Sequence, residues 1–364
     1  MSLKMSIKRN IKASILRWVT QKKSSEVIST PKSILFLRYD RIGDMIITTP
    51  VFREFKRVYP NSKVYVLASG TNSEIIKFNP HVDGIFLNHK HSLVSDFPTL
   101  IKLRKLKIDI AVEFDHSVVP HAILRLKIIK PNQIISVKKD GRYGVSGKEL
   151  MIYDYFTKKG KDEHSRDIWL RTIEIFTGKI INRNYEIFLN EESKVKSEKF
   201  IRHIDSDFYI GFNLEGAVKG KRICFYDFEE LASQIKKILP TAKIILFCHP
   251  KKRDQLNKKI EMSNLTNVCL SYPTFSIIDL CELVKKMNLI ITPDTSVVHI
   301  ASAFDIPIIS IHEKNLNSFK LFMPQSRVSR TVFSEEPNSL NGFKISEVVK
   351  FFKEIMNILG QKIL

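Results

Sequence analysis

The sequence is short of acidic side chains: 38 Asp and Glu residues stand against 59 Lys and Arg residues, giving a formal net charge of +21. An excess of this size indicates an anionic partner, and nucleic acid, anionic lipid and phosphorylated substrates would all satisfy it. The basic residues are spread along the whole chain, and neither a nucleic-acid-binding motif nor a zinc-finger spacing is present. We therefore do not expect a nucleic-acid partner.

Other absences narrow the class of protein further. The four cysteines form no CxxC pair, which favours reduced cysteines in a cytoplasmic protein over a disulfide framework. No run of 18 apolar residues predicts a membrane-spanning helix, and no signal peptide is evident. A GxGxxG motif is missing after the first predicted strand, so a dinucleotide site is unsupported. The remaining composition, 43% hydrophobic and 27% charged over 364 residues, predicts a globular chain long enough for two domains.

Residues 1–30 stand apart from the rest of the chain. Between Lys4 and Lys23 there are seven Lys or Arg residues and no acidic residue. Apolar side chains recur there at helical spacing, at Ile7, Ile11, Ile15, Trp18 and Val19. The pattern is typical of a basic amphipathic helix lying on an anionic membrane surface. A helix docked on the following domain would show the same pattern, and both interpretations stay open.

From residue 33 onward, strand and helix patterns alternate. Apolar runs predict buried strands at residues 34–38, 64–68, 108–114, 208–213, 243–248, 289–291 and 307–311. Helical stripes are expected at residues 51–59, 166–177, 228–239, 251–262, 277–287, 297–304 and 345–359. The first of these is expected to begin at Pro50, a favourable first-turn residue. The polar segment 138–161 is expected to be a loop.

This alternation predicts an α/β protein with parallel sheets that carry helices on both faces. The charged, apolar-poor stretch near residues 190–205 predicts a boundary between two lobes. We expect a first lobe over residues 31–190, a second over residues 191–340, and a final helical segment at 341–364.

Polar residues follow two predicted strands of the first lobe. Arg41-Ile-Gly43-Asp44 comes after the first strand, and ligands of open parallel sheets bind at that edge. Asp44 is therefore a candidate for taking a proton from a substrate, although it could instead cap the following helix. A second strand closes on further candidates for substrate binding, namely Glu113, Asp115 and His116. His116 could equally be a surface histidine.

The second lobe shows two matching signals. In Thr292-Pro-Asp-Thr-Ser-Val-Val-His299 a strand passes through a turn into a helix, whose free backbone N–H groups suit a phosphate or a polar sugar face. Another strand ends at Asn213-Leu-Glu-Gly216 and is followed by Lys219-Gly-Lys221-Arg222. Glycines allow close backbone approach and the cations suit a diphosphate. The alternative is that this basic loop is only solvated surface.

Taken in order, these motifs resemble glycosyltransferase family 9, the heptosyltransferases of bacterial lipopolysaccharide synthesis. The resemblance is carried by Leu35-Phe-Leu-Arg-Tyr-Asp-Arg-Ile-Gly-Asp44 with Thr49-Pro50, by Lys221-Arg222, and by the Thr292–His299 motif with Ala301 and Pro307. It implies the GT-B fold, two Rossmann-like lobes facing a central cleft, with the final helix packing back on the first lobe.

The resemblance also implies roles for particular residues. Asp44 would be the base that deprotonates the acceptor hydroxyl. The donor would be bound by Gly216, Lys221, Arg222, Asp294, Thr295, Ser296 and His299. The acceptor would be bound by Arg41, Glu113 and His116.

The activity implied is an inverting transfer of heptose from ADP-heptose to the inner-core oligosaccharide of lipopolysaccharide or lipooligosaccharide. No metal or other cofactor is expected, because cations and helix N-termini would stabilise the leaving nucleotide. The lipid-anchored acceptor implies a cytoplasmic enzyme that binds peripherally to the anionic inner face of the bacterial inner membrane.

Several residues depart from the family pattern. The family usually has Gly where Ser296 stands, an aromatic residue at Ile223, Gly near His312 and Glu313, and a Trp-containing stretch at Phe322-Met-Pro324. These positions lie in the donor lobe, so another nucleotide sugar is an alternative donor. A non-catalytic protein that binds anionic glycan or lipid is the rival interpretation. Such a binder would have no need for the carboxylate of Asp44.

Overall fold

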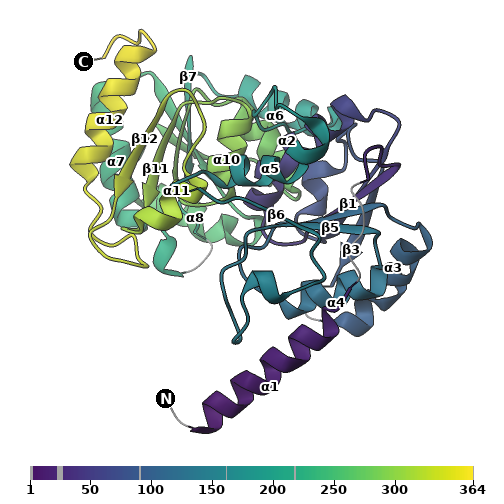
Figure 1. Ribbon diagram of the computed structural model, residues 1–364. Helices are drawn as coiled ribbons and strands as arrows, with labels where there is room; N and C mark the ends of the chain where they lie inside the picture. Colours follow the sequence, from purple (N-terminus) through teal and green to yellow (C-terminus); the bar gives the residue numbers. More distant parts are fainter. Residues whose placement is uncertain (1–2, 23–27, 90–91, 161, 217–218, 364) are drawn as a thin grey trace. The chain divides into compact units, whose positions relative to one another are not determined.

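The computed structural model describes residues 3–22, 28–89, 92–160, 162–216 and 219–363. The chain forms two compact units, Met1–Asn184 and Tyr185–Leu364, each built around its own parallel sheet (Figure 1). The predicted α/β class is therefore confirmed. The division falls six residues before the predicted boundary at residue 190.

The sheet of the first unit has six parallel strands in the order β3-β2-β1-β4-β5-β6. The strands are β1 Ser33–Arg38, β2 Lys63–Ser69, β3 Gly84–Asn88, β4 Ile110–Glu113, β5 Gln133–Val137 and β6 Tyr155–Thr157. Strand order reverses between β1 and β4. In open α/β sheets such a reversal opens a crevice at the carboxyl ends of the two strands.

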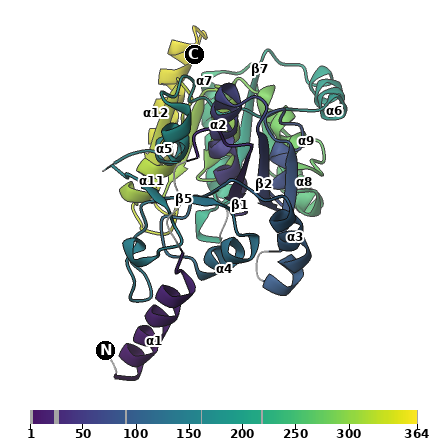
Figure 2. The ribbon, with the colours of Figure 1, turned by 45° about the vertical axis from the view of Figure 1, so that its right-hand side comes forward.

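Helices cover both faces of this first sheet. They are α1 Leu3–Val19, α2 Ile42–Val58, α3 Leu93–Lys105, α4 Pro120–Ile129 and α5 Ser165–Thr177, with short 3-10 turns at Ser73–Ile76 and Gly147–Glu149. Helices α2 and α5 pack together, as do α3 and α4. Side chains of α1, α3 and α4 share one hydrophobic cluster with one face of the sheet (Figures 1 and 2).

The second unit repeats the same arrangement. Its strands are β7 Phe208–Asn213, β8 Ala242–Phe247, β9 Val268–Leu270, β10 Leu289–Pro293, β11 Ile308–His312 and β12 Ser329–Phe333. They pair in parallel in the order β12-β11-β10-β7-β8-β9. The reversal lies between β7 and β10, so the topology matches that of the first unit strand for strand.

The helices of the second unit are α6 Glu191–Arg202, α7 Phe225–Ile238, α8 Arg253–Met262, α9 Ile277–Lys285, α10 Ser296–Ala303, α11 Leu316–Phe322 and α12 Ile345–Ile358, with 3-10 turns at Lys219–Lys221 and Pro250–Lys252. The final helix, α12, was expected to pack on the first lobe. Its buried residues Val348, Phe352, Ile355 and Met356 instead belong to the core of the second unit, where α12 lies against α7 (Figure 2).

Helix α2 begins eight residues before the expected start at Pro50. A proline inside a helix leaves the carbonyl one turn back without its usual N–H donor. Here the hydroxyl of Thr49 donates to that carbonyl, of Ile46, at 2.7 Å. The orphaned acceptor is thereby satisfied, the helix continues through Pro50, and Asp44 falls in its first turn.

One expected loop is corrected, and the stretch expected to hold the boundary contains a helix. The predicted loop 138–161 contributes the edge strand β6, which pairs with β5. The apolar-poor stretch near 190–205 contains α6, capped by the Asn190 side chain, which accepts from the backbone N–H of Ser193 at 3.0 Å. The hydroxyl of Ser193 donates to Asp279 of α9 at 2.8 Å. Polar contacts at its start thus join this charged helix to α9.

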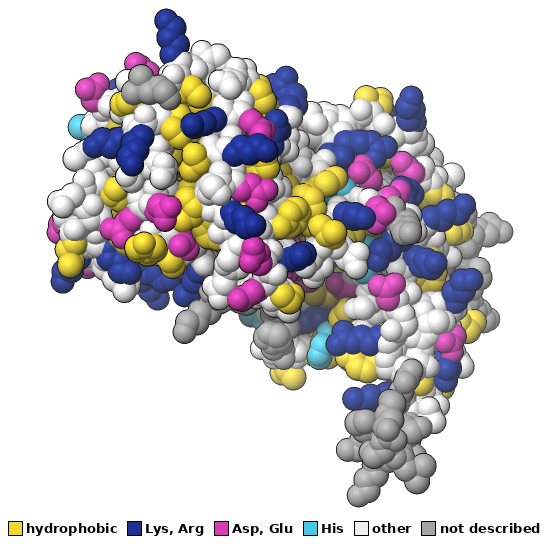
Figure 3. All heavy atoms as spheres, turned by 90° about the vertical axis from the view of Figure 1, so that its left-hand side faces the viewer, with side chains coloured by type: hydrophobic (Ala, Val, Ile, Leu, Met, Phe, Trp, Pro, Cys, Tyr) yellow, Lys and Arg dark blue, Asp and Glu magenta, His cyan; other side chains and the backbone are white. Residues whose placement is uncertain are grey.

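The surface carries basic and acidic side chains side by side. On the face drawn in Figure 3, Lys and Arg side chains are scattered and Asp and Glu side chains lie between them. This distribution agrees with the sequence, in which no basic block dominates. None of the described helices has the length and apolar character that crossing a membrane requires.

Candidate functional site

Asp44 lies at the carboxyl edge of the first sheet, in the first turn of α2. Its Oδ2 accepts the backbone N–H of Arg41, the exposed residue that precedes the helix, at 3.3 Å. Burial raises the pKa of Asp44 and the charge of Asp40 adds to this, while the guanidinium of Arg38 lowers it. The carboxylate is both a helix cap and a stronger base than an ordinary aspartate, so the two roles considered from the sequence are compatible.

Arg38, the last residue of β1, was not recognised from the sequence. Its side chain is almost fully buried, and its guanidinium lies 3.9 Å from the ring centre of Trp169 and 4.6 Å from that of Phe114. Nη1 donates to Asp40 at 3.0 Å, whereas Nε and Nη2 have no hydrogen-bond partner among the described residues. In the sequence Arg38 belongs to the Leu35–Asp44 motif that carries the resemblance, where it is a cation at the end of an otherwise apolar strand.

Glu113 does not present a free carboxylate. Its side chain is 1% exposed and forms an ion pair with Lys139, whose side chain is 0% exposed. The hydroxyl of Ser136 donates to the same carboxylate at 2.8 Å, and the backbone N–H of Asp115 donates to it at 2.9 Å. Burial opposes ionisation, but Lys139 and these hydrogen bonds hold the pKa of Glu113 below its usual value. We therefore reassign Glu113 from the acceptor to the support beneath the site.

Asp115 and His116 follow β4 and are half-buried. Burial and the neighbouring charge of Glu113 raise the pKa of Asp115 well above its usual value. Burial lowers the pKa of His116 to about 4, with the charges of Lys159 and Arg38 adding to the effect. The charge of Arg38 lowers the pKa of both Asp44 and His116.

In the second unit, an amide–hydroxyl network ties the ends of β7 and β10 together. The Nδ2 of Asn213 lies 3.1 Å from the hydroxyl of Thr292 and 3.3 Å from that of Thr295. Thr295 also caps α10, accepting the backbone N–H of Val297 at 3.3 Å. Ser296 is the first residue of that helix. The predicted strand–turn–helix is therefore present at the point where strand order reverses.

Lys221 reaches this turn from the loop after β7. Its ammonium lies 3.5 Å from Asp294 and donates to Glu313 at 3.0 Å. Glu313, at the end of β11, was noted in the sequence only as a departure from the family pattern. The structure makes it part of the site, and it leaves Lys221 between two carboxylates.

The loop that carries Lys221 is closed by its own backbone. A Cβ atom on Gly216 would lie 1.6 Å from the carbonyl oxygen of Lys221, so only glycine fits there. The N–H of Ile223 donates to the carbonyl of Leu214 at 3.0 Å and completes the turn. Arg222 points elsewhere: it pairs with Glu215 at 3.4 Å, an acid that also pairs with Lys252. The structure therefore does not bring Arg222 to the group formed by Lys221, Asp294 and Glu313.

Two buried histidines lie beside Asp294. Burial lowers the pKa of His299 to about 4, against the opposing charge of Asp294. Burial likewise lowers the pKa of His312, which packs against Phe319 at 5.0 Å between ring centres. Both rings are therefore neutral near pH 7. Among the residues that the structure describes, no three His, Cys, Asp or Glu side chains come together in a way that could hold a metal ion.

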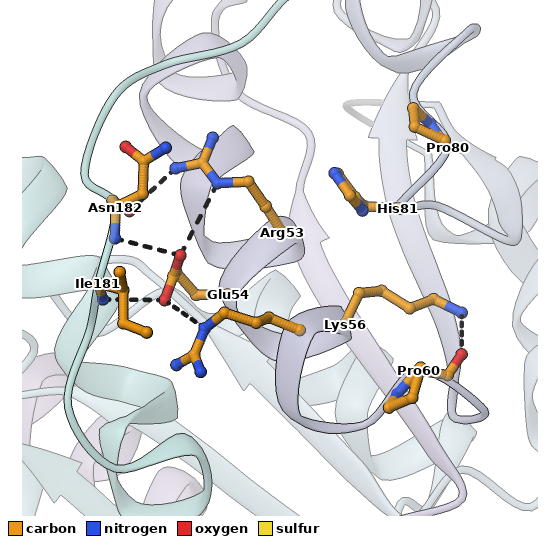
Figure 4. Close-up of a pocket in the computed structure, with 9 residues that line it drawn as sticks. Arg53, Glu54, Lys56, Pro60, Pro80, His81, Ile181 and Asn182 are labelled. Carbon is orange, nitrogen blue, oxygen red and sulfur yellow. Dashed lines mark hydrogen bonds and ion pairs between the residues drawn. The ribbon is translucent and has the colours of Figure 1, made fainter.

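The first unit has a pocket of about 540 Å³ at the C-terminal half of α2 (Figure 4). Its cations are already engaged: Arg53 donates to the carbonyls of Asn182 and Asn184, and Arg57 pairs with Glu54 at 3.1 Å. Glu54 in turn accepts backbone N–H groups of the segment that ends the first unit. These contacts hold that segment against α2, and we assign the pocket no ligand.

Comparisons with known proteins agree with this geometry. A sequence model of glycosyltransferase family 9 (heptosyltransferase) matches residues 141–342, more than half of the chain. The matched range includes all candidate residues of the second unit and begins after Asp44. A search of curated protein sequences found no match.

Solved structures with a similar fold include three relevant proteins. The family 9 glycosyltransferase of Veillonella parvula has 18% identity and a TM-score of 0.74, over 92% of this chain and 99% of that chain. ADP-heptose LPS heptosyltransferase II of E. coli has 16% identity and a TM-score of 0.68, over 90% and 99%. E. coli heptosyltransferase WaaC, solved with ADP, has 14% identity and a TM-score of 0.69, over 89% and 98%. Together with the two parallel sheets, this likeness confirms the GT-B fold class.

Proposed function

This chain belongs to glycosyltransferase family 9, the heptosyltransferase family, and from that premise we propose that it transfers heptose from ADP-heptose to the inner-core oligosaccharide of lipopolysaccharide. The observation that carries the proposal is a cluster of polar side chains at equivalent strand ends of each of the two sheets. We call these two clusters the half-sites. One offers a carboxylate base, and the other offers a lysine and a capped helix N-terminus.

Asp44 acts as the general base of this reaction. An alcohol becomes a good nucleophile only as its proton leaves, and a positioned base contributes about 10²–10⁴-fold. The acceptor oxygen forms a bond to the anomeric carbon as the bond to ADP breaks, and Asp44 takes the proton. A single displacement of this kind inverts the anomeric centre. Arg41, exposed one turn before Asp44, and the neutral His116 bind hydroxyl or phosphate groups of the acceptor in this proposal.

The second unit binds the donor. The N-terminus of α10 offers backbone N–H groups beside the hydroxyl of Thr295, and Lys221 offers a cation to the diphosphate. Asp294 accepts hydrogen bonds from sugar hydroxyls. Positive groups held in place before the reaction stabilise the leaving ADP, so the proposed reaction needs no metal ion.

Asp44→Asn tests the catalytic proposal. With ADP-heptose and a truncated lipopolysaccharide acceptor, the variant should lose at least about 100-fold in turnover. Its affinity for ADP should stay within a few-fold of wild type. Asp207→Asn, an exposed position just before β7, is the matched control and should behave as wild type. More than about a tenth of wild-type turnover in Asp44→Asn would rule out this base.

The pH profile gives a second readout of the same carboxylate. A base works only when deprotonated, so activity falls as pH drops through its pKa, which burial has raised. Replacing Arg38 by Met removes the charge that lowers this pKa. The acid limb of kcat/KM should therefore move to higher pH in Arg38→Met. A limb that stays in place would mean that another group is titrating.

A different nucleotide sugar is the second candidate donor. Glu313 contacts Lys221 directly, at a place where the resemblance leads us to expect glycine, so the donor pocket differs from the family pattern. Incubation with ADP-heptose, UDP-glucose and UDP-N-acetylglucosamine beside the same acceptor would distinguish the candidates. Consumption of a UDP-sugar in preference to ADP-heptose would replace the leading donor.

The acceptor proposed here is anchored in a lipid bilayer. We therefore place the enzyme at the cytoplasmic face of the inner membrane, held peripherally by its excess of basic side chains. Lys102, Arg104, Lys105 and Lys107 are all exposed on the first unit and would contribute to this attraction, at about 1 kcal/mol for each cation close to the surface.

A further inference from the structure

Helix α1 has two apolar faces, and only one of them is covered. Ala13 and Leu16 are buried in the core of the first unit, and Thr20 is buried just beyond the helix end. Ile11, Ile15 and Trp18 are exposed, at 54%, 54% and 72% of their surfaces. Docking on the domain and binding a membrane were alternatives in the sequence. The structure makes them compatible, because different residues serve each.

The geometry of the helix separates the two faces cleanly. With about 100° between successive residues, Ile11, Ile15 and Trp18 fall within about 60° of one another. The docked residues point to the opposite side, about 170° away by the same count. Lys12 and Arg17 occupy positions on the two flanks of the stripe and are both exposed.

Polar contacts hold α1 on the first unit and keep the stripe in place. Arg17 forms an ion pair with Glu149 at 2.6 Å, and the ammonium of Lys12 lies 5.6 Å from the ring centre of Tyr143. Just after the helix, Lys22 pairs with Asp154 at 2.5 Å. The stripe is therefore attached to the acceptor-binding unit and is not a free tail.

We infer that the stripe Ile11–Ile15–Trp18 inserts into the interface of an anionic lipid bilayer and orients the first unit against it. The inference rests on the proposed function only for the lipid-anchored acceptor. Apolar side chains and a tryptophan flanked by cations are the combination that interfacial helices present to anionic lipid. The net charge of +21 complements such a surface.

A second copy of the chain is the competing occupant of the stripe. Stable protein interfaces bury about 800 Å² on each partner. Three side chains on one helix offer much less, and the flanking cations would repel those of an identical partner. The lipid surface fits both the size and the charge of the stripe.

Vesicle binding tests the inference without any sugar acceptor. Vesicles of phosphatidylethanolamine and phosphatidylglycerol should bind the wild type in low salt, and vesicles of phosphatidylcholine should bind it weakly. The triple variant Ile11→Ser, Ile15→Ser, Trp18→Ser should bind the anionic vesicles about ten-fold or more weakly. Phe275→Ser, which removes an exposed aromatic ring from the second unit, is the matched control and should bind as wild type.

Tryptophan fluorescence reports the insertion directly. The chain has two tryptophans, Trp18 and Trp169, and Trp169 is only 2% exposed. Iodide in solution should therefore quench Trp18 alone, and anionic vesicles should remove that quenching and shift the emission to the blue. An unchanged melting temperature of the triple variant, expected because the docked face is intact, would show that it is folded.

Three results would overturn the inference. The first is equal vesicle binding by the triple variant and the wild type, and the second is continued quenching of Trp18 in vesicle-bound protein. The third is a dimer that forms without lipid and is lost in the triple variant, which would make a second copy the occupant. Turnover on a short water-soluble acceptor is measured separately. Its failure would count against the proposed function and leave the vesicle result standing.

Discussion

The buried ion pair between Lys139 and Glu113 gives the sharpest prediction about the first unit. Neither side chain reaches solvent, with exposures of 0% and 1%. Removing one partner leaves the other as an uncompensated buried charge, which typically costs about 3–5 kcal/mol. Lys139→Met should therefore destabilise the first unit by this amount. In a domain of roughly this size each kcal/mol lowers Tm by about 2–4 °C, so a fall on the order of 10 °C is expected.

A double variant shows how much of the stability lost in Lys139→Met comes from the unpaired charge of Glu113. In Lys139→Met, Glu113→Gln both charges are gone. The Gln oxygen can still accept the N–H of Asp115, and the Gln amide can donate to the hydroxyl of Ser136. Replacing a buried pair by uncharged groups is often nearly neutral, so most of the lost stability should return. Unfolding in urea can be followed by Trp169, which lies in the first unit and reports on it alone once Trp18 is quenched with iodide.

The same two variants, Lys139→Met and the double variant, test the reassignment of Glu113. If the carboxylate is a support, the double variant should keep the acceptor KM within a few-fold of wild type. A cost below about 1 kcal/mol for Lys139→Met would refute the argument, because it would mean that water reaches the pair. A large rise in acceptor KM without loss of stability would return Glu113 to the acceptor site.

Four further variants test individual residues. Asp115→Asn should stabilise the protein at pH 7 by about 0.5–2 kcal/mol. The pKa of Asp115 is higher in the folded protein than in the unfolded chain, so the ionised carboxylate disfavours folding at any pH above the unfolded pKa. The gain should vanish below about pH 4, where the carboxyl group is neutral in the folded and the unfolded protein. Glu313→Gln should tighten ADP binding about three- to ten-fold in calorimetry, because it removes a negative charge that competes for Lys221. Lys221→Ala should weaken ADP binding by about 1.5–3 kcal/mol. Weaker ADP binding in Glu313→Gln would mean that Glu313 contacts the donor. Gly216→Ala should reduce ADP affinity at least about ten-fold, because the new Cβ collides with the Lys221 carbonyl, and Gly70→Ala, with nothing within 4 Å, is the control that should change nothing.

The regular elements of the second unit were largely predictable from the sequence. β7 was predicted at residues 208–213, as observed, because an apolar run of this length favours a buried strand over a helix of ten or more residues. The start of α2 was missed for a physical reason. Pro50 was taken as a first-turn residue, and nothing in the sequence shows that Thr49 satisfies the carbonyl that Pro50 leaves open.

Side-chain partnerships were much less predictable than strands. Lys139 lies 26 residues from Glu113, and the two meet because β4 and β5 are parallel neighbours with Glu113 in register with Ser136. No local periodicity encodes such a pairing. The helical spacing of apolar residues could not predict where α12 packs either, because the same apolar stripe could cover either sheet. The contacts of α12 with α7, β11 and β12 decide it.

Each of the two half-sites combines one cation with two carboxylates, but the two cations differ in how freely they can move. In each, a cation contacts or lies near two carboxylates at the reversal of strand order: Arg38 with Asp40 and Asp44, and Lys221 with Asp294 and Glu313. The guanidinium of Arg38 is almost fully buried and stacked on the rings of Phe114 and Trp169, so packing holds its charge in one place. The ammonium of Lys221 ends a flexible, partly exposed chain and can exchange a carboxylate for a phosphate. Under the proposed function, a fixed charge suits the unit assigned the base, and a movable one suits the unit assigned to bind and release the nucleotide.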